Sequence, residues 1–134
     1  MSNNEDLEEA LPRGTASLAR LLAEPWMLDL RSFAARADLT EDELKDRLAR
    51  REVLAIGDPN GSPRFPEWQL APDGRVPLAI GALFEILNGE WAVYRFLAQH
   101  HNELGEQTGL EAILSGRSAE ALETAQGIVE GSFT

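Results

Sequence analysis

The sequence contains few residue combinations that could perform covalent chemistry. It has no cysteine, so it offers no thiolate nucleophile, thiolate metal ligand or disulfide. Its two histidines, His100 and His101, are adjacent, and Glu103 follows closely. Adjacent side chains project in different directions, so a single metal ion does not reach both histidines from regular backbone. We therefore expect a polar pair at a helix end, with no metal site and no cofactor.

Serines and carboxylates are scattered along the chain without the arrangement that catalysis needs. A catalytic triad requires a nucleophile, a base and an acid that orients the base. The sequence has no nucleophile elbow, no phosphate-binding glycine loop and no signature pair of catalytic carboxylates. The glutamates are spaced as they are on the solvent-facing side of helices. The sequence therefore predicts a binding protein and not an enzyme.

The basic residues are concentrated in one segment. Residues 25–56 carry six basic and seven acidic groups, whereas residues 78–134 carry two basic and eight acidic groups. The whole chain has a net charge of −11, so it has no overall attraction for phosphates or anionic membranes and favours basic partners. Any contact with DNA must therefore be local. The candidate DNA-contacting residues are Lys45, Arg47, Arg50, Arg51 and Arg64.

The elements expected around these basic residues are three short helices and a β-hairpin. The helices are predicted over 15–24, 30–37 and 40–51, and the hairpin over 53–65. Thr40 and Glu43 form a capping box at the start of the third helix. Ala34 is small enough for two helices to cross closely, and Asp38 tolerates the left-handed backbone of the turn between them. A helix–turn–helix followed by a hairpin is the layout of winged DNA-binding units.

The start of the helix expected to read DNA is acidic. Glu41, Asp42 and Glu43 place three carboxylates there, and residues 41–51 carry four basic and four acidic groups. This balance predicts weak and salt-sensitive DNA binding by a single copy. It also supports an alternative, in which a phage or host adaptor uses the winged fold for protein contacts alone.

The C-terminal half is predicted to be a helical bundle. Apolar runs predict helices over 78–87 and 90–100, a capping box at Thr108 and Glu111 starts another, and Ser118 begins the last. The expected fold is therefore mainly α, with a winged helix–turn–helix-like unit and short β-hairpin packed on this bundle. The expected parts are a flexible acidic N-terminus over 1–14, the winged unit over 15–70 and the helical domain over 71–134.

Five segments and an apolar helix resemble a known family in their residues and order. The segments are 64–70, 73–75, 91–97, 102–105 and 110–114, and the apolar helix follows the second of them. Together, over about residues 64–130, they resemble the MbcA/ParS/Xre antitoxin C-terminal domain family. Phe96 and Leu97 stand where the family has Trp-Leu, and Asn102, Leu104 and Gly105 match its loop.

The resemblance implies a function and a partner. Antitoxins of this family bind a RES-type, NAD-consuming toxin through this domain, cover its active site and often repress their own operon. The resemblance therefore implies a toxin-like protein partner, operator DNA and a homodimer. The candidate partner-contacting residues are Asn102, Glu103, Leu104, Gly105 and Phe133. Phe133 has two interpretations, as a plug for the core or as an anchor for a partner.

Other functions and the location of the protein follow from the same features. A DNA-binding transcription regulator without a toxin remains an alternative, in which the C-terminal bundle only dimerises. A neighbouring toxin gene would favour the antitoxin, and an isolated gene beside a palindrome would favour the regulator.

No apolar run approaches the ~18 residues of a membrane span, and the acidic N-terminus differs from a signal peptide. We therefore expect a cytoplasmic protein without membrane contact.

Overall fold

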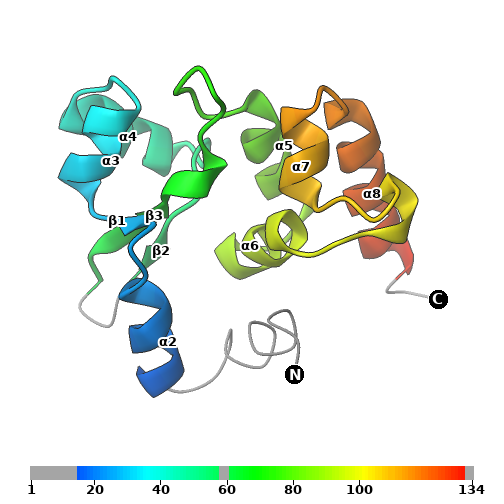
Figure 1. The fold of residues 1–134 in the computed structure, drawn as a ribbon, viewed down its shortest axis with the longest axis horizontal. Helices are drawn as coiled ribbons and strands as arrows, with labels where there is room; N and C mark the ends of the chain where they lie inside the picture. The colour runs from blue at the N-terminus through cyan, green and yellow to red at the C-terminus, as the bar shows by residue number, and fades with distance from the viewer. Residues whose placement is uncertain (1–14, 58–60, 132–134) are drawn as a thin grey trace.

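The chain runs from a helical unit with a small sheet into a bundle formed by the later helices (Figure 1). The computed structural model describes residues 15–57 and 61–131, with side chains from residue 19 onward. The segment expected over 1–14 and the candidate Phe133 lie outside these residues. Within the described ranges, no helix combines the length and apolar character needed to cross a bilayer.

A three-stranded antiparallel sheet supports the N-terminal unit. β1 (Met27–Leu28) and β2 (Ile56–Gly57) flank β3 (Pro63–Pro66) on its two edges. Leu28 pairs with Phe65 in this register. The β2–β3 pair is the predicted wing, and the residues at its tip, 58–60, lie outside the described part of the chain.

Three helices of the described residues precede the wing, and two of them form the helix–turn–helix. They are α2 (Thr15–Leu22), α3 (Leu30–Arg36) and α4 (Glu41–Ala49). A small core joins α3, α4 and the sheet, and Phe33, Leu44 and Phe65 are all fully buried in it. The rings of Phe33 and Phe65 stack with centroids 5.0 Å apart. Ala34 is 2% exposed, as expected for the close helix crossing.

Four helices and a short 3₁₀ turn form the C-terminal bundle. They are α5 (Leu78–Ile86), α6 (Glu90–Ala98), the 3₁₀ turn η2 (Asn102–Leu104), α7 (Gly109–Leu114) and α8 (Ser118–Gly131). Their buried residues form one core with Leu21 of α2, Met27 of β1 and Ile56 of β2. The winged unit is therefore packed directly on the bundle, which confirms the expected fold class. The exact boundary near residue 70 remains a prediction.

An aromatic series crosses the junction between the two units. Trp68 contacts Trp26 with ring centroids 6.0 Å apart and meets Tyr94 of α6 edge-on at 5.6 Å. Trp91 meets Tyr94 at 5.8 Å. Burial raises the pKa of Tyr94 to about 12, with a smaller contribution from the charge of Glu24. Trp68 therefore fixes the end of the wing to the bundle.

Some local predictions were wrong. Residues 53–56 are not a strand: Val53 and Leu54 are buried in a loop, and only Ile56 pairs with β3. Residues 67–69 do not extend the hairpin but form a 3₁₀ turn, η1 (Glu67–Gln69), in which the fully buried side chain of Gln69 donates to Pro66 O. The short strand β1 was not predicted at all, since two residues carry no periodicity.

Candidate functional site: α4 and the arginine groove

The helix α4 is the exposed member of the helix–turn–helix. Its capping box is formed as predicted: Glu43 N donates to Thr40 Oγ1 at 3.0 Å, and Thr40 N donates to Glu43 Oε1 at 2.8 Å. Only Leu44 of this helix is fully buried. The helix is therefore anchored along one side, while the rest of its surface is accessible to a ligand.

Two aspartates shape the ends of α3, since Asp29 caps its start and Asp38 lies in the turn that follows it. Asp38 has a φ of 57°, the left-handed conformation expected for it. Asp29 caps α3 by accepting a hydrogen bond from Ser32 N at 2.8 Å. This bond is the main cause that lowers the pKa of Asp29, with smaller contributions from the charges of Arg64 and Arg31.

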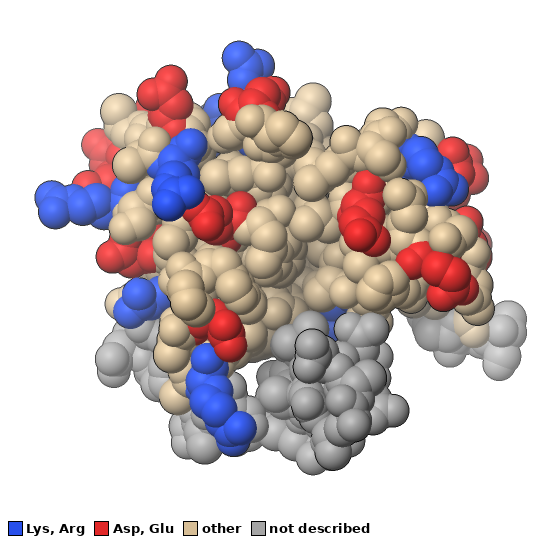
Figure 2. Space-filling view, viewed as in Figure 1, with Lys and Arg blue, Asp and Glu red and all other residues tan. Residues whose placement is uncertain are grey.

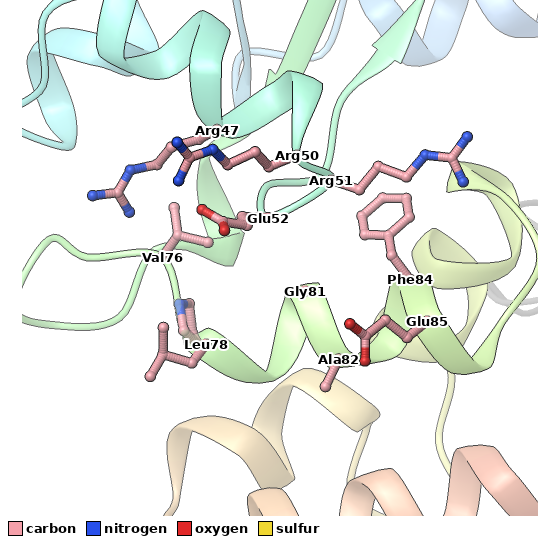
Figure 3. Close-up of a pocket in the computed structure, with 11 residues that line it drawn as sticks. Arg47, Arg50, Arg51, Glu52, Val76, Leu78, Gly81, Ala82, Phe84 and Glu85 are labelled. Carbon is pink, nitrogen blue, oxygen red and sulfur yellow. The ribbon is translucent and has the colours of Figure 1, made fainter.

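The five candidate DNA-contacting residues do not form one cluster. Arg47, Arg50 and Arg51 are exposed and line a single groove between the end of α4 and helix α5 (Figure 3). Lys45 is exposed but does not line this groove. Arg64 is half-buried on β3, where its charge acts on Asp29 at the start of α3. The structure thus brings three of the five residues together.

The end of α4 turns Arg51 into the groove. Arg51 has a φ of 58°, and Glu52 N donates back to Arg47 O at 3.0 Å. This left-handed position after a helix is usually occupied by glycine, since a side chain there costs about 1 kcal/mol. The strained backbone aims Arg51 toward the Phe84 end of the groove, while Arg47 and Arg50 project toward Val76 (Figure 3).

The groove, which we call the arginine groove, has a cavity volume of about 580 Å³. Its second wall belongs to α5 and the segment before it, and includes Val76, Leu78 and Phe84. Leu78 is 94% exposed, although it belongs to an apolar run. An adjoining hollow of about 610 Å³ shares Arg47, Val76 and Leu78 and extends to Arg75. One wall of the arginine groove thus carries three arginines beside Glu52, and the other is apolar apart from Glu85.

Acidic side chains lie close to these arginines. Asp46 pairs with Arg50 at 3.3 Å, one helical turn away. Glu41 lies 3.8 Å from Arg31 of the preceding helix. Both pairs are well exposed, so each contributes little to stability. Figure 2 shows acidic and basic side chains intermixed over the winged unit, in agreement with the balanced charge of residues 41–51. The arginine groove itself has two carboxylates, Glu52 and Glu85, beside its three arginines, so its lining has a local excess of one positive charge.

The candidate partner-contacting residues lie around η2. Asn102, Glu103 and Gly105 are exposed, whereas Leu104 is fully buried in the bundle core. Leu104 therefore supports the loop from inside and does not present its side chain to a partner. The role of the exposed members remains a prediction.

The loop around η2 is held by a residue that the sequence analysis did not select. Arg117 donates from Nη1 to Leu104 O at 3.1 Å and to Gln107 Oε1 at 2.6 Å. It also pairs with Glu120 at 2.6 Å, which lowers the pKa of that carboxyl. A lone arginine before a helix gives no sequence signal for this bridging role, which depends on the tertiary fold.

Of the two adjacent histidines, His101 packs against Phe96 of α6. His101 Nε2 lies 2.9 Å from Phe96 O, and its ring stacks on Phe96 with centroids 4.5 Å apart. No group of histidines and carboxylates suited to a metal ion occurs in residues 15–57 and 61–131.

Comparisons with known proteins give one informative result. No family model and no curated protein matches the chain. Among solved structures, the NMR structure of Rv2175c is similar, with a TM-score of 0.66 and 18% sequence identity over 80% of this chain and 82% of that chain. The matched length exceeds either unit, so the likeness spans both the winged unit and the bundle. At this identity it shows the fold alone.

Proposed function

We propose that this protein binds DNA through the end of α4 and the β2–β3 wing, as a transcription regulator. The observation that carries the proposal is the clustering of Arg47, Arg50 and Arg51 at the exposed end of the second helix of a winged helix–turn–helix. In such units this helix enters the major groove, and basic side chains around it contact phosphates. The protein acts here by binding, without catalysis.

The acidic start of α4 determines which end of the helix can contact the DNA backbone. Glu41, Asp42 and Glu43 disfavour close approach to phosphates. The arginines at the other end of α4, together with the wing, therefore make the main backbone contacts. Since Asp46 already pairs with Arg50, one copy binds weakly and loses affinity rapidly as salt rises.

Removal of the acidic charges tests this proposal. Replacement of Glu41, Asp42 and Glu43 by glutamine is expected to strengthen DNA binding several-fold, because it removes three negative charges that repel phosphates. Glutamine at position 43 keeps a capping-box side chain, so the helix itself should be preserved. The control replaces Glu111, Glu123 and Glu130 by glutamine, which changes the net charge equally and also includes a capping-box residue. Equal effects of the two sets, or no gain from the first, would contradict DNA contact by α4.

The charge of the C-terminal bundle favours a second function. Residues 78–131 carry two basic and eight acidic groups. An acidic surface attracts a basic partner and raises the rate of association. Together with the resemblance of residues 64–130, this supports a role as an antitoxin that covers a RES-type, NAD-consuming enzyme.

This second function has its own test. A RES-type enzyme encoded beside this gene should copurify with the tagged chain after nuclease treatment and lose its NAD consumption in the complex. Charge reversal at Glu103 should weaken the complex, whereas reversal at Asp42 on the winged unit should not. Retention of full NAD consumption with the chain in excess would exclude the antitoxin role.

A further inference from the structure

The arginine groove has chemistry that DNA alone would not use. Its lining has three arginines, Arg47, Arg50 and Arg51, against two carboxylates, Glu52 and Glu85, and the facing wall also presents Leu78 at 94% exposure and the half-buried ring of Phe84. A phosphate backbone would leave this apolar wall in contact with water. An occupant that satisfies both walls must carry carboxylates on one side and aliphatic side chains on the other.

The chain itself contains such a segment outside the described residues. Residues 5–11 read Glu-Asp-Leu-Glu-Glu-Ala-Leu, with four carboxylates. Leu7, Ala10 and Leu11 have the spacing that would place them on one side of a helix in the bound state. The segment therefore complements the three arginines of the groove in charge and the facing wall in apolar character.

We propose that the arginine groove binds residues 5–11 of a second copy of this chain. Figure 1 places α2 on the other side of the sheet from α4 and α5. Leu11 precedes the first residue of α2, Thr15, by only four positions, which is at most about 14 Å of extended chain. These positions favour a neighbouring copy as the source. Reciprocal exchange of the segment closes a two-fold symmetric dimer.

Such a dimer has a regulatory consequence that rests on the proposed DNA binding. The bound segment covers Arg47, Arg50 and Arg51, so self-association and DNA binding compete for the same side chains. A rise in protein concentration then lowers the fraction of copies able to bind DNA. The association itself does not depend on DNA and is tested without it.

The test is a charge exchange in the full-length chain, measured by sedimentation velocity at low salt. The first variant carries Glu8→Lys and Glu9→Lys, and the second carries Arg47→Glu and Arg51→Glu. Each variant alone should be monomeric where the native chain dimerises, with a dissociation constant raised more than about tenfold. An equimolar mixture should dimerise again, because each segment then meets a groove of opposite charge.

A matched control reverses two other exposed basic residues of the winged unit, Arg31→Glu and Lys45→Glu. This control should dimerise like the native chain, since neither residue lines the groove. A native chain that stays monomeric up to millimolar concentration, or a mixture of variants that fails to associate, would overturn the proposal. Dimerisation of the native chain at high concentration, with no DNA binding at the lower concentrations where it is monomeric, would instead overturn the proposed function and leave this inference standing.

Discussion

The side chain of Gln69 is fully buried and forms two hydrogen bonds to one residue, Leu54. Leu54 N donates to Gln69 Oε1 at 2.8 Å, and Gln69 Nε2 donates to Leu54 O at 2.9 Å. The same Nε2 donates to Pro66 O at 3.0 Å. A single carboxamide thus joins the loop before β2 to the end of β3, and so fixes the base of the wing.

Substitution of this carboxamide should destabilise the fold strongly. Gln69→Leu has a similar size but leaves the backbone groups of Leu54 and Pro66 O without their partner. Unsatisfied buried polar groups of this kind cost about 2–4 kcal/mol in total. Urea unfolding measures the change, and Gln126→Leu on the exposed side of α8 is the control, with an expected change within about 0.5 kcal/mol. Equal changes in the two variants would show that Gln69 does not fix the wing.

Two glycines in the bundle should respond to alanine in opposite directions. A Cβ at Gly109 would lie 2.5 Å from Phe96 O and 2.6 Å from the Phe96 ring, so Gly109→Ala should destabilise the protein by about 2 kcal/mol or more. A Cβ at Gly127 in α8 would meet nothing within 4 Å, so Gly127→Ala should stabilise it by up to about 1 kcal/mol. Thermal unfolding of the two variants checks the signs. A neutral Gly109→Ala would disprove the close packing of α7 on α6.

The strained backbone at Arg51 predicts a conflict between stability and binding. Arg51→Gly should raise the free energy of unfolding by about 1 kcal/mol, because glycine adopts positive φ without strain. The same change removes a groove cation and should weaken DNA binding. Glu106→Gly is the matched control: Glu106 has a φ of 70° and lies in the C-terminal bundle, so it should gain stability without loss of DNA binding. An Arg51→Gly variant with native DNA affinity would remove Arg51 from the site.

The cap of α3 predicts a specific dependence of stability on pH. The hydrogen bond from Ser32 N lowers the pKa of Asp29 below its ordinary 3.8. The ionised form is therefore favoured in the folded state. Its contribution is present above pH 3.8 and is lost as the pH falls through the lower pKa of the folded protein.

Asp29→Asn isolates this effect, because asparagine keeps a cap acceptor and does not titrate. The difference in unfolding free energy between the native protein and this variant should be constant above about pH 5 and shrink below pH 3.8. Curves that stay parallel down to the lowest pH at which both proteins fold would contradict the assigned role of Asp29.

The features that the sequence predicted correctly are those set by neighbouring residues. Both capping boxes form, at Thr40–Glu43 and Thr108–Glu111, because each depends on a side chain and a backbone amide three residues apart. Asp38 takes its left-handed turn for a similarly local reason. Such features are visible in the sequence because no distant segment is needed to form them.

The features that the sequence did not predict depend on segments far apart in the chain. The arginine groove exists only because the end of α4 faces α5, and the apolar run that contains the wall residue Leu78 predicted a helix without showing which side of it is exposed. Leu78 is the first helical residue after Pro77, and packing leaves it exposed. The bridge from Arg117 to Leu104 O is likewise tertiary.

The central claim is that the arginines at the end of α4 contact DNA phosphates. Its most direct test is the affinity for a labelled random-sequence duplex, measured by fluorescence anisotropy across a range of salt concentrations. The native chain should bind at low salt. The combination of Arg47→Gln and Arg51→Gln should reduce the slope of log affinity against log salt by about two, or about 0.9 per lost phosphate contact.

The matched control is Arg20→Gln with Arg95→Gln, two exposed arginines outside the groove. It changes the net charge equally and should keep the native slope. A smaller slope for the groove variant alone is expected if Arg47 and Arg51 contact phosphates. Absence of salt-dependent binding by the native chain, or the same slope for both variants, would contradict it.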